Sequence, residues 1–403
     1  MAHERERHIA DIFDKLLKFS PIVGVFGHRQ VGKSTFLAGC IKNYRTLDDV
    51  DELENARRAP KDFIRSTKNP PLAIDECQLE PKLFPTLKEW VRTRKQPGQF
   101  VLSGSVRFTS RKTIKESLAG RMAFVEMMPF SVTELLSKPL SDVVLKLFSH
   151  KQFSEDSIRC LNQTSQLKNL MKHFNNYLEN GGLPGLCFVR SPQLQKNALF
   201  ELHDLILSRD LSLVSEIRTP VTILKRLIAH IAKCGFEPYI ASDVKRSIGL
   251  APQTQKKILD AMESIFLIRR IPVPLRKKEI ILLEDQLEER AYAGSSLSLS
   301  KRLETAVFRN IRTQFYYRLD KNIQFETYLT RDHARVPIVL KDGDNTLGII
   351  VHESESPSLS EVRSAASFLR NHANAKVLYL TAAMTGPKIL DDRSMICSLA
   401  AVL

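Results

Sequence analysis

A short segment near the start of the chain combines two glycines with a lysine and two hydroxyl side chains, a combination that suits phosphate. Its spacing matches G-x-x-x-x-G-K-[ST] without deviation, with an apolar run before it and a helical pattern after it. The glycines permit a tight turn in which successive amides point into one concavity, and the helix N-terminus adds partial positive charge. Lys33 would contact the β- and γ-phosphates, and the Ser34 hydroxyl would occupy one position on Mg²⁺. The segment therefore predicts that ATP and Mg²⁺ bind to Gly27, His28, Arg29, Gln30, Val31, Gly32, Lys33, Ser34 and Thr35.

Two adjacent carboxylates, Asp75 and Glu76, follow the apolar residues Leu72 to Ile74. The end of a strand is where a P-loop site needs a second acid, and we expect this strand to lie beside the first one. Asp75 would hold Mg²⁺ through water, together with Ser34, and Glu76 would polarise the water that attacks the γ-phosphate. An acidic pair at a strand end is common, so its weight comes from its pairing with the phosphate-binding segment.

Three further polar side chains complete the predicted site, and each has an ordinary alternative. Ser103 and Ser105 end the apolar run 100–108, where either hydroxyl could contact the γ-phosphate or simply mark the turn after a strand. Arg121 follows a helical pattern and could stabilise phosphoryl charge, in its own subunit or across a subunit interface, or could lie on the surface. The predicted catalytic residues are Lys33, Glu76, Ser103 and Arg121.

These groups require strands that deliver them to one edge of a sheet. Residues 21–27, 72–74 and 100–108 have the pattern of buried strands, and residues from 32 onward have the pattern of a helix. Strands that alternate with helices predict an α/β fold with a parallel sheet. The 403 residues are too many for one ordinary core, so roughly two to four domains are expected.

Composition limits the partners and the compartment. Sixty basic and 45 acidic residues give a net charge of +15, which favours polyanionic partners or else reflects a solvated basic surface. The six cysteines show no CxxC pair and no disulfide spacing, which predicts buried, reduced thiols in a cytosolic protein. No run approaches the roughly 18 apolar residues that span a bilayer, and the charged start lacks the apolar core of a signal peptide. We therefore expect a cytoplasmic protein without membrane contact.

Five segments resemble a known family in their order and spacing: GHRQVGKST, YRTLDDVDELENARRAPKDFI, LAIDECQ, FVLSGSVRF and SLAGRMAFVEMMPFSVTELL. They resemble the prokaryotic AAA+ ATPases whose C-terminal half is a domain of unknown function. Later segments such as YLENGGLPGL, LHDLILSRDLS and SLSKRLETAVFRNI are similar to later landmarks of that architecture, so the resemblance covers most of the chain. It implies a P-loop AAA+ core over 1–128, a helical lid or connector over 129–220, a winged-helix module over 221–280 and a restriction-endonuclease-like domain over 281–403.

Residues 221–280 have the rhythm of a helix-turn-helix followed by a strand pair. Three helical patterns come first, and the basic run 267–284 could form the wing of a winged helix. A DNA-binding version would direct five residues at the start of the third helix into the major groove: Gln253, Thr254, Gln255, Lys256 and Lys257. The wing would contact phosphates through Arg269, Arg270, Arg276, Lys277 and Lys278. Winged helices also dock proteins, so DNA and protein partners both stay open.

The last segment departs from the nuclease pattern that the resemblance implies. Such a fold normally carries an Asp and a Glu-x-Lys on its central strands for metal-assisted hydrolysis. Here Pro337 stands in place of the Asp, and Ile350 and His352 stand in place of the Glu and the Lys. Glu304 alone cannot hold a divalent cation in catalytic geometry. We therefore expect a degenerate, catalytically inactive nuclease-like α/β tail.

Together these features predict a multidomain α/β protein that hydrolyses ATP with Mg²⁺, by in-line attack of water on the γ-phosphate. Positioning and charge neutralisation would supply most of the acceleration. The favoured role couples hydrolysis to DNA or nucleoprotein binding. The alternative is a nucleotide-switched signalling or scaffold protein that binds other proteins, and a nuclease is disfavoured. The rate of turnover and the formation of a homo-oligomer stay open.

Overall fold

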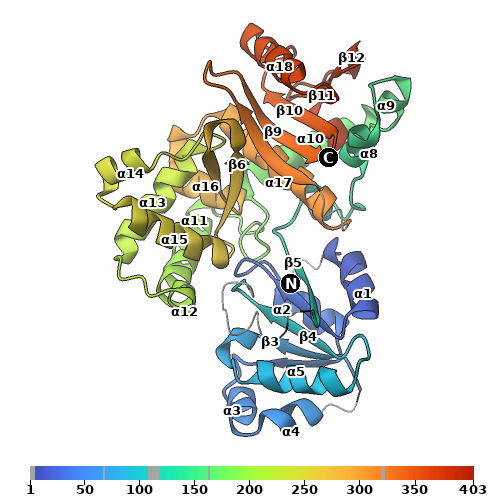
Figure 1. The fold of residues 1–403 in the computed structure, drawn as a ribbon. Coiled ribbons are helices and arrows are strands. Elements are labelled where there is room, and N and C mark those ends of the chain that lie inside the picture. Colours follow the sequence, from blue (N-terminus) through green and yellow to red (C-terminus); the bar gives the residue numbers. More distant parts are fainter. Residues whose placement is uncertain (1–4, 67–68, 108–117, 119, 162–163, 319–322) are drawn as a thin grey trace.

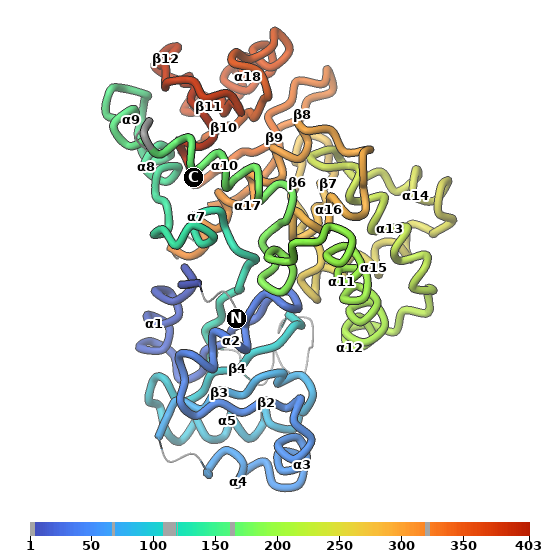
Figure 2. Tube along the Cα trace, turned by 180° about the vertical axis from the view of Figure 1, so that it is seen from behind, coloured from blue at the N-terminus to red at the C-terminus, as the bar shows by residue number. Residues whose placement is uncertain are grey.

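Two β-sheets lie at opposite ends of the molecule, with helices between and beside them (Figures 1 and 2). The computed structural model describes residues 5–66, 69–107, 118, 120–161, 164–318 and 323–403. The N-terminal sheet and its helices form one end, and the C-terminal sheet forms the other (Figure 1). Helices from residues 192–264 lie along one side in both views.

The N-terminal sheet has five parallel strands in the order β2-β3-β4-β1-β5. Their bounds are β1 (Ile22–Phe26), β2 (Asn43–Thr46), β3 (Leu72–Asp75), β4 (Phe100–Gly104) and β5 (Met122–Glu126). The expectation that the Asp75 strand lies beside the first strand is wrong, because β4 lies between β1 and β3. Apolar runs identify strands, but the crossover helices that pack on the sheet decide which strands pair. As a result Ser103, on β4, lies between the first strand and the strand of Asp75.

Alternate residues of β1 face two different layers of helices. The helices are α1 (Ile9–Phe19), α2 (Lys33–Cys40), α3 (Val50–Arg58), α4 (Pro60–Arg65) and α5 (Leu83–Thr93). Val23 and Val25 pack in one core with α1 and α2. Ile22 and Phe26 pack in another core with α3, α4 and α5. Burial on both faces explains why β1 has a continuous apolar run.

Residues 129–220, expected as one helical unit, pack into two different cores. Their elements are α7 (Val132–Leu135), α8 (Val143–Ser149), α9 (Glu155–Arg159), α10 (Thr164–Asn180), α11 (Pro192–Leu205), the π-helical turn η3 (Ile206–Asp210) and α12 (Leu211–Val214). Buried side chains of α8 and α10 pack with the C-terminal sheet. Those of α11, η3 and α12 pack with the helices that follow them. The boundary between these cores falls near residue 182, inside the expected unit.

Three helices and a hairpin follow, which is the order of elements in the expected winged helix. They are α13 (Val221–Cys234), α14 (Ala241–Ile248), α15 (Pro252–Ser264), β6 (Ile268–Val273), a 3-10 turn (Pro274–Arg276) and β7 (Lys278–Leu283). The hairpin is buried on both faces, since Ile281 and Leu283 pack in the helical core while Ile280 and Leu282 pack in the core of the C-terminal sheet. The strands therefore join two cores instead of projecting into solvent. Helix α16 (Gln286–Ala293) packs in the helical core as well.

The C-terminal sheet has six strands in the order β12-β13-β11-β10-β9-β8. Its elements are α17 (Leu299–Tyr316), β8 (Gln324–Leu329), β9 (Arg335–Asp342), β10 (Asn345–His352), α18 (Leu359–Asn371), β11 (Ala375–Thr381), β12 (Lys388–Asp391) and β13 (Ser394–Ser398). Strands β10, β11 and β13 run parallel, and the other pairings are antiparallel. Helix α17 packs on one face and α18 on the other, which makes this end a mixed α/β unit.

The helices and the cysteine side chains bear on the expectations about membrane contact and buried thiols. No helix in the described part of the chain has both the length and the apolar character that a bilayer crossing requires. All six cysteines are free, but Cys40 is exposed, so the expectation of burial is wrong there. The buried face of α2 runs through Lys33, Leu37 and the following Ile41, at every fourth residue, and this spacing leaves Cys40 outside.

Candidate nucleotide-binding site

The phosphate-binding segment lies between β1 and α2, at the C-terminal edge of the parallel sheet (Figure 1). Gly32 has a φ of 95°, and a side chain at Gly27 would place its Cβ 2.2 Å from the carbonyl oxygen of Met127. Backbone geometry therefore requires both glycines. Lys33 begins α2, is 5% exposed, and donates to the carbonyls of Gly27 and His28 at 3.0 Å. Its ammonium group thus lies against the inner side of the loop.

Asp75 collects three hydroxyl donors at the end of β3. Ser34 and Tyr44 donate to Oδ2 at 2.5 and 2.6 Å, and Ser103 donates to Oδ1. Burial alone would raise the pKa of this carboxyl, but the hydrogen bonds from Ser103, Ser34 and Tyr44 hold the pKa below its usual value. The carboxylate therefore stays ionised among neutral donors. Three predicted site residues, Ser34, Asp75 and Ser103, come together here from three separate elements.

Glu76 lies next to this group in a sparsely populated backbone conformation. Its φ and ψ are 52° and 38°, in the left-handed region, and the residue is 9% exposed. Gln78 donates to its Oε2. Burial raises the pKa of Glu76 and lowers the pKa of Lys33, because each group loses solvation that the charge of the other only partly replaces. Backbone strain and perturbed ionisation together are features that cluster at functional sites.

Asp210 is a further acid at this site that the sequence analysis did not identify. It ends η3, is 2% exposed, and lies 3.3 Å from both the Arg29 guanidinium and the Ser105 hydroxyl. Ser105 therefore contacts Asp210, whereas Ser103 contacts Asp75, which separates the two serines that the sequence left as alternatives. No local pattern indicates that an acid 181 positions from Arg29 would pair with it.

Elements outside the sheet cover the loop. Arg7 donates to the Val31 carbonyl at 2.8 Å and forms an ion pair with Glu134 at 3.0 Å. The turn after α10 approaches from another side, since a Cβ at Gly185 would lie 2.8 Å from Oε1 of Gln30. Four loop residues are buried: Gly27, His28, Val31 and Lys33. Arg29 and Gly32 are half-buried, and Gln30, Ser34 and Thr35 are exposed.

Arg121 lies at the opposite edge of the sheet from the phosphate-binding segment. It directly precedes Met122, which pairs with Ile22 at the start of β1. The loop follows Phe26 at the end of β1, so roughly 15 Å of strand separates the two edges. Arg121 therefore does not contact the loop of its own subunit, and a role across a subunit interface stays a proposal. A cavity of about 520 Å³ near the starts of β3 and β4 also lies away from the phosphate site.

The five residues expected to contact DNA do not share one surface. Four of them are exposed at the start of α15: Gln253, Thr254, Lys256 and Lys257. Gln255 is 1% exposed, accepts from the Tyr239 hydroxyl and donates to the carbonyls of Ala241 and Leu250. The expected DNA contact of Gln255 is wrong, because this position shares the buried helix face of Ile258 and its neighbours.

The arginines expected on the wing have partners inside the protein. Arg269 pairs with Glu126 and Glu284, Arg270 pairs with Asp260, and Arg276 donates to the Thr330 carbonyl. These contacts hold the hairpin to the N-terminal sheet, to α15 and to the C-terminal sheet, so the expectation that the three arginines reach phosphates is wrong. Lys277 and Lys278 at the tip of the hairpin are exposed.

The carboxylate of Glu304 in the C-terminal unit is paired with an arginine. Arg335 donates to its two carboxylate oxygens at 2.8 and 2.6 Å, and Glu304 is 4% exposed. Pro337 is buried on β9, and Ile350 and His352 are buried on β10. The guanidinium already neutralises the single carboxylate of the expected nuclease position.

Comparison with known proteins identifies the N-terminal part. Residues 19–136 match a family model described as an AAA domain. An uncharacterized protein of Mycobacterium tuberculosis and one of Mycobacterium bovis are each 24% identical over 259 residues, which cover 64% of this chain and 51% of the relative. The chain thus spans about half the length of the curated relatives it matches.

Solved structures give weaker likenesses. One is a Signal Transduction ATPase with Numerous Domains (STAND) protein with a tetratricopeptide repeat sensor, from Pyrococcus horikoshii. The alignment covers 79% of this chain and 47% of that protein, at 12% sequence identity and a TM-score of 0.26. Another is a protein from Vibrio cholerae, whose alignment covers 90% of this chain and 89% of that protein, at 11% sequence identity and a TM-score of 0.16. Such scores do not establish a shared overall fold. The family match and the loop on its parallel sheet make residues 19–136 a P-loop domain of the AAA type.

Proposed function

We propose that the chain binds ATP with Mg²⁺ and hydrolyses it. The observation that carries the proposal is the meeting of Ser34, Asp75 and Ser103 beside the phosphate-binding segment. Mg²⁺ prefers hard oxygen ligands, and the Ser34 hydroxyl with the ionised Asp75 carboxylate is a donor set of this kind. Ser34 and Asp75 would hold the metal ion, which would neutralise negative charge on the phosphate groups.

Each side chain has a separate task in this proposal. Lys33 and the loop amides hold the β- and γ-phosphates at the start of α2. Ser103 holds the Asp75 carboxylate in its orientation from the neighbouring strand. Glu76 accepts a proton from the attacking water, for which it must be ionised. Catalysis then rests on positioning and charge neutralisation, without a covalent intermediate on the protein.

Phosphate release with Mg²⁺ and with a chelator tests the proposal. We expect ATP hydrolysis that depends on Mg²⁺ and is lost in Asp75→Asn, since the neutral amide cannot replace an ionised ligand. Asp51→Asn changes an exposed acid on α3 and is the matched control, which should keep the parent rate. A folded Asp75→Asn protein with the parent rate and the parent Mg²⁺ dependence would remove Asp75 from the site.

A second proposal concerns what hydrolysis drives. The net charge of +15 and the exposed side chains of Gln253, Thr254 and Lys256 favour DNA contact along the start of α15. Lys257 is exposed as well, but it donates to the Glu216 carbonyl at 2.8 Å and would have to release it to reach a phosphate. The buried hairpin and its paired arginines favour the alternative, a nucleotide-switched scaffold that binds protein. Of the two roles we propose DNA binding, with the contact surface limited to these four residues.

DNA binding across a salt series separates the two roles. With the double variant Lys256→Gln/Lys257→Gln we expect weaker binding, and a plot of log affinity against log salt that is shallower by about one if only Lys256 contacts phosphate and by about two if Lys257 also releases the Glu216 carbonyl. Lys388→Gln, an exposed lysine on β12, is the control and should behave like the parent. If the parent protein neither binds DNA at low salt nor hydrolyses ATP faster with it, the scaffold role is the one that remains.

A further inference from the structure

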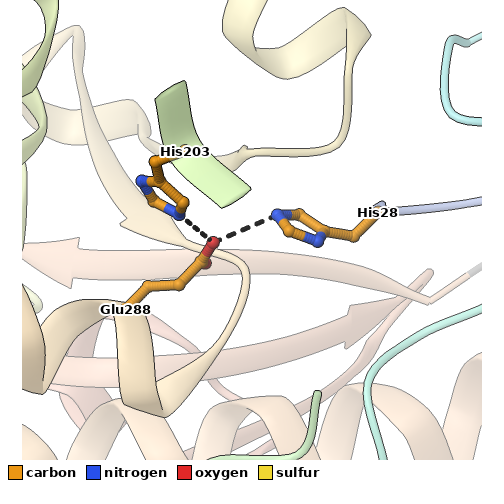
Figure 3. Close-up of side chains that lie close together, drawn as sticks. All are labelled: His28, His203 and Glu288. Carbon is orange, nitrogen blue, oxygen red and sulfur yellow. Dashed lines mark hydrogen bonds and ion pairs between the residues drawn. The ribbon is translucent and has the colours of Figure 1, made fainter. Parts of the chain in front are cut away.

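Two histidines and a glutamate from distant parts of the chain converge behind the phosphate-binding segment (Figure 3). Nε2 of His28 and Nε2 of His203 lie 3.0 and 2.8 Å from the same oxygen, Oε1 of Glu288. His28 belongs to the loop, His203 to α11 and Glu288 to α16. All three side chains are fully buried. The His28 ring therefore points away from the phosphate side of the loop and into the interface with the helical core.

The hydrogen bonds around His28 leave its second ring nitrogen facing a carboxylate oxygen, where a positive charge, carried by a proton or a metal ion, would be favourable. Nδ1 of His28 lies 2.6 Å from the Arg29 carbonyl oxygen, which can only accept, so Nδ1 must carry a proton. In a neutral ring Nε2 then presents a lone pair to a carboxylate oxygen, and the two repel. Nε2 of His28 has no hydrogen-bond partner among the described residues, although Oε1 is 3.0 Å away. A proton or a metal ion on this nitrogen would remove the repulsion.

The outer contacts match those of metal-binding histidines. A metal ligand usually donates its other ring N–H to a carbonyl or similar group, which fixes the tautomer. His28 does this with the Arg29 carbonyl, and Nδ1 of His203 lies 3.0 Å from the Tyr292 hydroxyl, which serves either tautomer. Oε2 of Glu288 accepts from the Asp285 backbone, which leaves Oε1 for the histidines.

We propose that His28, His203 and Glu288 form a Zn²⁺ site that ties the phosphate-binding loop to α11 and α16. Two imidazoles and a carboxylate are a donor set that suits Zn²⁺. Ligand atoms at about 2.0–2.1 Å from a tetrahedral Zn²⁺ lie roughly 3.4 Å apart. The three ligand atoms already lie within 4.8 Å of one another, so small side-chain rotations complete the site. All three side chains are fully buried, so no substrate reaches the ion and its role would be structural.

A proton competes for the same position. Histidine binds Zn²⁺ only in its neutral form, so Zn²⁺ binding should weaken as pH falls. This dependence follows from the ligands alone and does not rest on ATP binding or hydrolysis, so the site is testable in the absence of nucleotide.

The test measures metal on the full chain after chelation, addition of Zn²⁺ and removal of unbound ions. We expect one Zn²⁺ per chain in the parent, a raised melting temperature with Zn²⁺, and the visible absorption of a tetrahedral centre when Co²⁺ replaces it. His203→Gln and Glu288→Gln each remove a ligand and should weaken Zn²⁺ binding by more than the roughly 10–100-fold typical of losing an outer partner. Tyr292→Phe removes only an outer partner and should weaken binding within that range.

His173→Gln is the matched control, because this half-buried histidine on α10 lies outside the cluster and its loss should leave the metal content unchanged. A folded parent protein that retains no Zn²⁺ at micromolar concentration would overturn the proposal and leave a proton-linked ion pair in its place. Zn²⁺ and Co²⁺ bound equally by the parent, His203→Gln and Glu288→Gln would also overturn it. The measurements on the parent decide the question even if a variant fails to fold.

Discussion

Two buried carboxylates, one in each α/β unit, are held by opposite kinds of partner. Asp75 at the end of β3 accepts from the hydroxyls of Ser34, Tyr44 and Ser103. Glu304 on α17 accepts two hydrogen bonds from the guanidinium of Arg335. Each acid is 5% exposed or less and lies beside a sheet. The difference is in charge, because hydroxyl donors leave the carboxylate with its full negative charge and a guanidinium cancels it.

That difference decides which unit can bind a cation. An ionised carboxylate among neutral donors can exchange one of them for a metal ion at the cost of a hydrogen bond. A carboxylate paired with arginine must first lose a buried ion pair, which costs more. The proposed metal site therefore lies at Asp75, whereas the carboxylate of Glu304 already has a cationic partner.

The largest effect is expected from Glu76→Gln in the N-terminal unit. The amide cannot accept a proton from water, so hydrolysis should fall roughly 10²–10⁴-fold while ATP still binds through Lys33 and Asp75. Phosphate release and nucleotide binding, measured on the same protein, check both parts. Because burial raises the pKa of Glu76, the parent should lose activity on acidification at a higher pH than an ordinary glutamate would allow. Glu89→Gln, at an exposed position of α5, is the control, and parent-like turnover in Glu76→Gln would place the base elsewhere.

The second prediction breaks the ion pair of the C-terminal unit. Arg335→Met leaves the buried Glu304 carboxylate without its partner and should lower the free energy of unfolding by about 2 kcal/mol, discounted because Arg335 is 31% exposed. Glu304→Gln leaves the Arg335 guanidinium without its partner, but water can reach this group, so the free energy of unfolding should fall by less. Denaturant unfolding measures both variants, and equal losses would contradict the asymmetry.

The third prediction removes the cation of the phosphate-binding loop. Lys33→Ala should weaken ATP binding at least tenfold, which corresponds to about 1.4 kcal/mol, because Lys33 is the side-chain cation that lies against the inner side of the loop. Fluorescent nucleotide titration checks the change, with Lys42→Ala after α2 as the control. Unchanged affinity in Lys33→Ala would remove the loop from nucleotide binding.

The two units were also predictable from sequence to different degrees. The loop could be identified because a short backbone motif fixes its own geometry, and the Asp75–Glu76 pair because it follows an apolar run. The match of residues 19–136 supports an AAA-type domain in this part of the chain, and the roles of the individual residues stay predictions. Asp210, Arg7 and Tyr44 could not be identified, because each reaches the site from an element that is distant in sequence. The pairing of Glu304 with Arg335 joins a helix to a strand, and no local spacing predicts it.

The same limit explains the errors at the winged-helix region. Helical periodicity predicted three helices correctly as elements, but it did not show that Gln255 faces inward to bond with Tyr239. The hairpin is rich in basic residues, as expected of a wing that binds phosphate. Arg269 pairs with Glu126 of β5 and Arg270 pairs with Asp260 of α15, so these partners of the hairpin are visible only in the folded chain.

The fourth prediction concerns Arg121, at the edge of the sheet opposite to its own loop. If this arginine serves a neighbouring subunit, Arg121→Ala and Lys33→Ala should each be inactive alone and should regain activity when mixed. In an equal mixture about a quarter of head-to-tail interfaces would pair an intact loop with an intact arginine, so up to a quarter of parent activity is expected. Two variants that assemble together without any rescue would exclude the role between subunits.

The smallest effect is expected in an assay of DNA cleavage by the C-terminal unit. Metal-assisted cleavage of a phosphodiester needs at least two oxygen ligands on one cation and a group that activates water. Pro337 and Ile350 supply no ligand, and Glu304 is already bound to Arg335. The parent protein should therefore leave single- and double-stranded DNA intact with Mg²⁺ or Mn²⁺, and Glu304→Gln should change nothing in that assay. Cleavage that survives Lys33→Ala but disappears in a folded Glu304→Gln protein would show that Glu304 exchanges its arginine for a metal ion, which would remove the contrast between the two acids.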